Sequence, residues 1–290
     1  MNSNFIIMGL PASGKTTFLA ALWHLVESNE TPCRLECYDY RGDFSYLNSI
    51  ATAWRTFKAV PRTSQTGDMN VSIMLRNRDT GECGIAFFPD LAGETFDRQV
   101  EERRCYRDFV DSFSEEDGVL FFISADLKED DLSITDLNAR LPINKAEQIE
   151  DSSAINENEM ALNEWEPKFL PWQVKIVQLL SDLTRPPFVQ RKRRIAILIS
   201  AWDLVRSMGN TPQEWLSVNM PLVAQFLKTN VDYFNFEIFG VSAQGGRLDD
   251  NSAIDEAAKG LASRRIQIVG PQGEGHDLTE PLVWLMTATK

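Results

Sequence analysis

The segment Gly9-Leu-Pro-Ala-Ser-Gly-Lys-Thr16 constrains the fold of this chain more than any other feature. It matches the pattern GxxxxGK[ST]. It lies between a short apolar run, Phe5–Met8, and a segment from Thr17 to Val26 whose apolar side chains fall at helical spacing. A strand, a glycine-rich loop and a helix in this order bring backbone N–H groups and a helix N-terminus to one point, where they stabilise a polyphosphate. The sequence therefore predicts a site for a nucleoside triphosphate.

This loop is expected to supply the phosphate contacts and one metal ligand. The Lys15 ammonium would reach the β- and γ-phosphates, and the Thr16 hydroxyl would ligate Mg²⁺. Most other contacts would come from backbone N–H groups. The residues expected to touch the nucleotide are Gly9, Pro11, Ala12, Ser13, Gly14, Lys15, Thr16 and Thr17.

The rest of the chain alternates between apolar runs and helical patterns, which is typical of an α/β fold. Strands are expected at 118–125, 195–200 and 234–241, with a hairpin over 70–75 and 83–88. Helices are expected at 44–58, 97–113, 172–183, 212–229 (with Thr211 as its N-cap and a break at Pro221) and 278–287. We predict one domain over 1–290, a three-layer sandwich with a mostly parallel sheet and one antiparallel edge hairpin.

Charge is unevenly distributed along the chain. Residues 126–166 hold 12 acidic and 3 basic side chains, which gives −9 of the total net charge of −13. We interpret 126–168 as an acidic insertion within the domain. The acidic total argues against direct nucleic-acid binding. No apolar run approaches the roughly 18 residues of a membrane span, and a strand starts at residue 5, so a cytoplasmic location is expected.

Three further motifs follow expected strands. Asp90-Leu-Ala-Gly93 comes after the hairpin, Ser200-Ala-Trp-Asp203 ends the strand at 195–200, and Ser242-Ala-Gln244 ends the strand at 234–241. In this order the sequences GLPASGKT, DLAGE, SAWD and VSAQ resemble Ras-like P-loop GTPases of the translation-factor-related class. The phrases GLPASGKTTFLAALWHLV and HDLTEPLVWL are similar to divergent bacterial GTPase domains of paired-GTPase, conflict-associated systems. The resemblance spans residues 9–244 and implies Ras-like topology.

The resemblance implies two more groups of contacts at the phosphate end. Asp90 would hold the Mg²⁺ water shell, and the Gly93 N–H would meet the γ-phosphate. The first switch segment of such proteins supplies a Thr to the metal, and Thr63 is preferred here over Thr66. The metal ligands would then be Thr16, Thr63 and Asp90.

At the other end of the nucleotide, the resemblance implies base recognition by Trp202, Asp203, Ser242, Ala243 and Gln244. The Asp203 carboxylate would accept hydrogen bonds from guanine N1 and N2, and a backbone N–H of the Ser-Ala-Gln element would meet O6. The Asn and Lys of the family pattern are Ser and Ala in this chain. Packing on the base would therefore come from elsewhere, and Trp202 is the candidate.

The expected function is a Mg²⁺-dependent switch that binds GTP and GDP, hydrolyses GTP slowly and signals to a protein effector or a second GTPase. Slow hydrolysis is expected because Glu94 replaces the Gln that often orients the attacking water, and because Pro11 occupies a loop position often filled by Gly. Two alternatives stay open. One is an ATP-using P-loop enzyme, either an ATPase or a small-molecule kinase, and the other is a nucleotide-binding interaction module that does not hydrolyse.

Overall fold

The structure is a computed structural model that describes residues 3–61, 71–89, 94–105, 107–113, 118–126, 170–250, 253–255 and 259–287. The strands are β1 Ser3–Gly9, β2 Leu35–Arg41, β3 Val71–Asn77, β4 Cys83–Phe88, β5 Gly118–Ser124, β6 Arg193–Ser200, β7 Phe234–Ser242, β8 Gln267–Gly270 and β9 Gly273–Gly275. The α-helices are α1 Lys15–Ser28, α2 Phe44–Arg55, α3 Glu94–Glu102, α4 Arg107–Ser112, α6 Trp172–Asp182, α7 Pro212–Asn219, α8 Pro221–Thr229 and α10 Glu280–Met286. Short 3₁₀ helices are η2 Trp202–Leu204, η3 Arg206–Met208 and η4 Ala262–Arg265.

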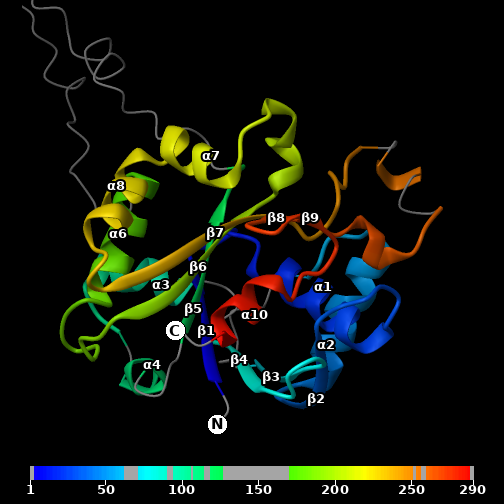
Figure 1. Cartoon of the computed structure of the whole chain (residues 1–290), viewed down its shortest axis with the longest axis horizontal. Helices are drawn as coiled ribbons and strands as arrows, with labels where there is room; N and C mark the ends of the chain where they lie inside the picture. The colour runs from blue at the N-terminus through cyan, green and yellow to red at the C-terminus, as the bar shows by residue number, and fades with distance from the viewer. Residues whose placement is uncertain are drawn as a thin grey trace, which may run out of the picture.

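All nine strands form one twisted sheet in the order β2-β3-β4-β1-β5-β6-β7-β8-β9 (Figure 1). The pairings from β4 through β1, β5 and β6 to β7 are parallel. The β2–β3–β4 edge and the β7–β8–β9 edge are antiparallel. The predicted α/β class with a parallel centre is therefore confirmed. The predicted edge hairpin is β3–β4, and a second antiparallel edge, β8–β9, was not anticipated.

Side chains alternate between the two faces of the sheet and build a core on each. On β1, Phe5 and Ile7 belong to the core under α1, α2 and α10, whereas Ile6 and Met8 belong to the core under α3, α6, α7 and α8. The central strand β5 is buried at every position. Helices on both faces of a parallel sheet bury its strands completely, which explains the continuous apolar runs in the sequence. The architecture is the three-layer sandwich that was predicted.

Two expected helices are each divided in two. The segment 97–113 forms α3 and α4, and Arg103 between them has a left-handed backbone, with φ of 57°. The segment 212–229 forms α7 and α8, since Pro221 lacks the N–H that would continue the first helix. Thr211 caps α7 as predicted, because its side chain accepts from the Glu214 N–H in a capping box.

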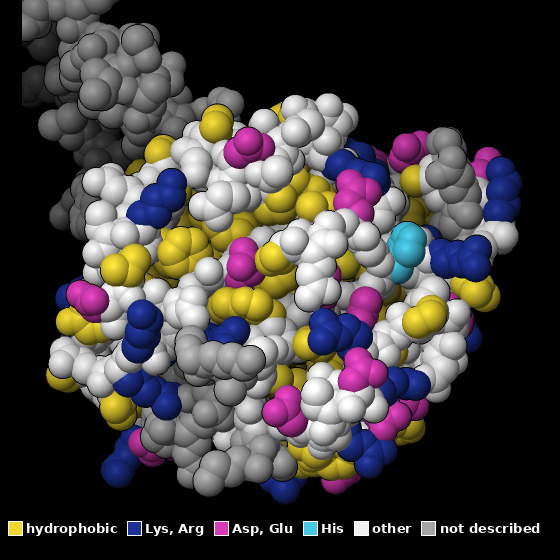
Figure 2. Space-filling model, viewed as in Figure 1, with side chains coloured by type: hydrophobic (Ala, Val, Ile, Leu, Met, Phe, Trp, Pro, Cys, Tyr) yellow, Lys and Arg dark blue, Asp and Glu magenta, His cyan; other side chains and the backbone are white. Residues whose placement is uncertain are grey.

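The surface is mixed in charge over the face shown in Figure 2. Basic and acidic side chains of the described residues are interspersed there, with apolar side chains visible between them. In the described part of the chain, no helix combines the length and apolar character needed to cross a membrane.

Candidate functional site

The loop between β1 and α1 turns sharply, with a left-handed backbone at two positions. Ala12 has φ of 59°, and Gly14, directly before α1, has φ of 90°. A Cβ on Gly14 would lie 2.9 Å from the Ser200 Cβ, and a Cβ on Gly9 would lie 2.6 Å from the Ser13 Oγ. Both glycines are therefore required by backbone conformation or close contact, as expected for a loop that closes around a ligand.

Lys15 begins α1 and is only 3% exposed. Its ammonium donates to the Gly9 carbonyl at 2.8 Å, to the Leu10 carbonyl at 2.9 Å and to the Ser13 Oγ at 3.3 Å. The side chain thus folds back over the loop, at the N-terminal end of α1, where the helix dipole favours an anion. Thr16 is half-buried in the same first turn and carries a hydroxyl oxygen, a hard ligand of the type that Mg²⁺ prefers.

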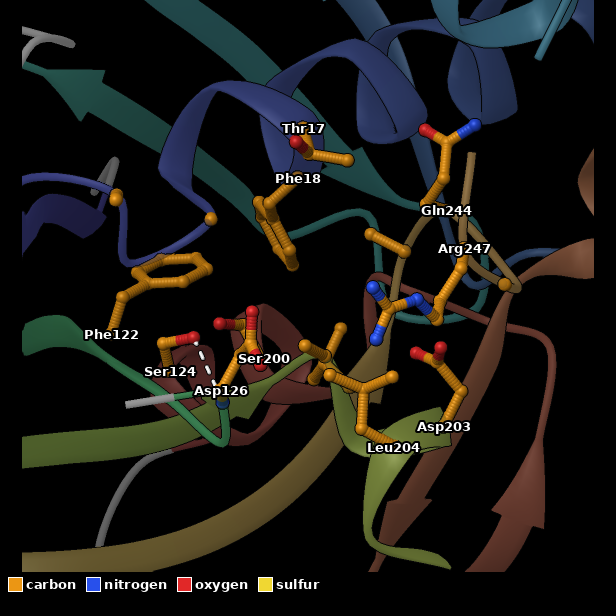
Figure 3. Close-up of a pocket in the computed structure, with 16 residues that line it drawn as sticks. Thr17, Phe18, Phe122, Ser124, Asp126, Ser200, Asp203, Leu204, Gln244 and Arg247 are labelled. Carbon is orange, nitrogen blue, oxygen red and sulfur yellow. Dashed lines mark hydrogen bonds between the residues drawn. The ribbon is translucent and has the colours of Figure 1, made fainter. Parts of the chain in front are cut away.

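A pocket of about 240 Å³ adjoins the loop. Its lining includes Ala12, Gly14 and Thr17 from the loop and α1, Asp203 after β6, and Ala243 and Gln244 after β7 (Figure 3). These segments meet because β6 and β7 are parallel neighbours whose carboxyl ends lie at the same edge of the sheet as the end of β1. This edge is where open α/β sheets bind ligands. The structure therefore brings the expected phosphate and base residues together.

Asp203 is held in place by the next strand. The Ser242 Oγ donates to the Asp203 Oδ1 at 2.6 Å. Ser242 is 1% exposed, so this hydroxyl supports the carboxylate from beneath and leaves its other oxygen for a ligand. Ser242 is thus a supporting residue, while Asp203, Ala243 and Gln244 line the pocket.

Ser200 joins the two halves of the site, a role that its position in the sequence did not reveal. Its hydroxyl donates to the Ser13 carbonyl of the loop at 2.8 Å, and it also lies 3.4 Å from the Ile123 carbonyl of β5. Ser200 therefore ties the phosphate loop to the end of β6, two residues before the 3₁₀ turn that contains Asp203.

The expectation that Trp202 packs on the base is wrong in this structure. The indole is 2% exposed and lies against Gly240 of β7, where a Cβ would approach its ring to 2.5 Å. Trp215 of α7 makes an edge-to-face contact with it, with ring centroids 6.4 Å apart. The side chain points into the core because burial of a large aromatic ring outweighs any contact it could make at the pocket rim.

Several lining residues were not foreseen from the sequence. Arg247 reaches into the pocket toward Asp203, and Leu204 lies beside them (Figure 3). Asp126, two residues after the end of β5, lines the pocket as well. Arg247 lies three residues after Gln244, in a stretch without a recognised motif. The one sequence signal for Arg247 is its position shortly after the Ser-Ala-Gln element.

Several predictions lie outside the described residues. These are the metal-site predictions for Thr63, Thr66 and Asp90, the γ-phosphate contact of Gly93, the side chain of Glu94 and the acidic insertion beyond Asp126.

The fold and this site define a P-loop nucleotide-binding protein. A family model, Double-GTPase 1, matches residues 6–285, and the chain belongs to that family. Membership supports guanine-nucleotide binding and a general GTPase character. No curated protein matches the sequence.

Three solved structures are similar to this chain at low sequence identity. A Plasmodium falciparum protein described as nucleolar GTP-binding protein 1 is 12% identical, with 91% of this chain and 87% of that chain covered and a TM-score of 0.40. The Ski7 GTPase-like domain of S. cerevisiae, bound to GTP, is 13% identical, with 85% and 44% covered and a TM-score of 0.39. A signal recognition particle receptor complex from Chaetomium thermophilum gives 11%, with 84% and 91% covered and a TM-score of 0.34.

Proposed function

We propose that this protein is a Mg²⁺-dependent guanine-nucleotide switch that hydrolyses GTP slowly and signals to a protein partner. The observation that carries the proposal is the arrangement of Lys15 and Asp203. The ammonium lies at the phosphate loop, and the carboxylate lies in the adjoining pocket. Ser200 connects the two regions through its hydrogen bond to Ser13.

Base selection follows from the chemistry of Asp203. With one oxygen held by Ser242, the other is free to accept from the N1–H and N2–H donors of guanine. Adenine does not present these donors on that edge, so it would leave the carboxylate without a partner, which is costly in a pocket. Guanine over adenine is therefore the expected preference.

A side chain is also needed to stack on the face of the base, and Arg247 is suited to this role. Trp202 is buried and Ala201 has only a methyl group, whereas the Arg247 guanidinium extends into the pocket. Asp249 accepts from its Nε at 3.1 Å and from its Nη2 at 3.2 Å, in an exposed ion pair that favours this orientation. A planar cation over a purine gains both stacking and cation–π attraction.

Hydrolysis would rest on positioning and charge. Mg²⁺ bound by the Thr16 hydroxyl and phosphate oxygens would neutralise developing charge. Lys15 and the loop N–H groups would orient the β- and γ-phosphates. The rate expected without a partner is about 10⁻⁴ to 10⁻² s⁻¹, as for unassisted GTPases.

The test is equilibrium binding of GTP and of ATP to the purified chain, side by side, with Mg²⁺ and with excess EDTA. A preference for GTP of about thirtyfold or more supports the switch. A preference for ATP would refute it in favour of an ATPase or kinase. Single-turnover hydrolysis of bound GTP then separates a slow GTPase from a binding module that does not hydrolyse.

A further inference from the structure

Trp54, near the end of α2, makes a contact that the proposed mechanism does not use. Its indole is fully buried, at 0% exposure. The indole N–H donates to the carbonyl of Ala243 at 2.8 Å, across 189 residues of sequence. Ala243 belongs to the loop after β7 that lines the pocket, but Trp54 itself does not line it. A core side chain therefore holds one peptide group of the base-recognition loop.

That peptide group has two ends. The Ala243 carbonyl and the Gln244 N–H belong to the same planar unit, and in a trans peptide they point in opposite directions. The only cis bond among the described residues is Pro186-Pro187, so the 243–244 bond is trans. Since the carbonyl points to Trp54 in the core, the Gln244 N–H points away from the core. The Gln244 side-chain amide is directed away from Asp203 (Figure 3), so it does not occupy the space beside the carboxylate.

The loop is also held from the side of α2 and η4. The Arg265 guanidinium lies over the Trp54 ring at 4.9 Å and over the Phe57 ring at 5.2 Å. It donates to the Trp54 carbonyl at 2.8 Å. Gly245, with φ of 83°, packs so closely on Arg265 that a Cβ would lie 2.6 Å from the Arg265 Cβ. The indole and the loop therefore share one rigid support, and neither can rotate without disturbing the other.

We propose that Trp54 is a positioning residue for base recognition, which acts through Ala243 to aim the Gln244 N–H at the 6-oxo group of guanine. The proposal rests on the proposed function, because it assumes that Asp203 reads the N1 and N2 edge of the same base. In this arrangement one buried hydrogen bond in the core fixes the donor that distinguishes a 6-oxo purine from a 6-amino purine.

The test uses Trp54→Phe, which keeps an aromatic ring in the core and removes the N–H. Two nucleotide analogues distinguish recognition at C6 of the base from recognition at its N2 amino group. 6-Thioguanosine triphosphate replaces the oxygen at C6 by a poor acceptor and keeps N1–H and N2–H, whereas inosine triphosphate keeps the 6-oxo group and lacks the N2 amino group. In W54F the affinity for GTP should fall about 3–10-fold, the worth of one neutral hydrogen bond. Affinity for the thio analogue should change less than about twofold. The ratio of GTP to inosine triphosphate affinity should stay unchanged, since Asp203 is untouched.

Trp23→Phe is the matched control. Trp23 is 2% exposed in the same core layer, and its indole N–H donates to the Asn48 Oδ1 at 3.3 Å, away from the base loop. We expect W23F to lower stability without changing either ratio. If W54F does not fold, Arg265→Lys removes the planar support of the same indole from outside the pocket, and it should lower the GTP to thio-GTP ratio.

Two results would overturn the inference in different ways. If W54F, or R265K in its place, weakens GTP and the thio analogue equally, Trp54 has only a structural role, while the proposed function stands. If the unmodified chain shows no preference for GTP over ATP, the proposed function fails first, and Trp54 has no 6-oxo group to recognise.

Discussion

The contact between Gly14 and Ser200 allows a prediction that is independent of any ligand. In Gly14→Ala the new methyl group adds two unfavourable contributions to the free energy of folding, backbone strain and overpacking. An L-residue with φ near 90° is strained by about 1–2 kcal/mol. The Cβ also lies 2.9 Å from the Ser200 Cβ and 3.0 Å from its Oγ, an overpacking that costs about 1–3 kcal/mol. The free energy of unfolding should therefore fall by about 2–5 kcal/mol.

Gly209→Ala isolates the first penalty. Gly209 has φ of 75°, and a Cβ there meets no atom within 4 Å. This variant should lose only the backbone strain, about 1–2 kcal/mol. Urea unfolding of both variants without nucleotide measures the difference, which is the steric share of the Gly14 change.

A double-mutant cycle with Ser200→Gly tests whether the steric part of the Gly14→Ala destabilisation comes from contact with Ser200. Removing the Ser200 side chain leaves space for the methyl group introduced in G14A, so the combined loss should be smaller than the sum of the single losses. Equal losses in G14A and G209A, or strict additivity in the cycle, would refute the claim that the loop packs against the end of β6.

Three further outcomes are expected. Asp203→Asn should weaken GTP binding by about 100-fold or more and favour xanthosine triphosphate, whose C2 oxygen suits an amide donor; unchanged GTP affinity in a titration would remove Asp203 from the base site. Lys15→Ala should abolish GTP binding and, because the ammonium also binds loop carbonyls, lower the free energy of unfolding without nucleotide by about 1.5–3 kcal/mol in urea. Burial raises the pKa of the Glu280 carboxyl, so the folded chain binds its proton more tightly than the unfolded chain does. The free energy of unfolding therefore falls as the pH rises from the pKa of this group in the unfolded chain to its pKa in the folded chain. Glu280→Gln should remove that part of the decline in unfolding experiments carried out as the pH is raised from about 4; an identical pH profile would contradict it.

The parts of the fold that could be predicted are those whose signal is local. β5 and β6 are buried on both faces, so they read as uninterrupted apolar runs. Thr211 and Pro221 specify the start and break of α7 and α8 by backbone chemistry alone. By contrast, β2 was missed because it lies at the sheet edge, half-exposed and with an irregular register between Cys37 and Asp39. Such a strand has neither an apolar run nor a clean alternation.

The residues of the site also fall into those that could be predicted from local sequence and those that could not. Lys15 and Asp203 belong to motifs with a fixed spacing to their strands, so their placement at the same edge of the sheet could be expected. The contacts of Ser200, Arg247 and Trp54 depend on which side chains the fold brings together from distant segments. Trp202 shows the converse error. Its sequence neighbours suggested a place at the base, but a tryptophan beside Gly240 has a flat, fully buried surface available and packs there instead.

The hydrogen bonds of Lys15 make nucleotide binding an exchange of partners. An ammonium has three N–H donors, and in this chain three protein oxygens accept from it. A phosphate oxygen therefore competes with the Gly9, Leu10 and Ser13 oxygens, and the bond to the Ser13 hydroxyl is the longest of the three. The loop thus contains its own substitute for the ligand. These bonds hold the loop in place when no nucleotide is bound. Breaking them reduces the net free energy gained when a nucleotide binds.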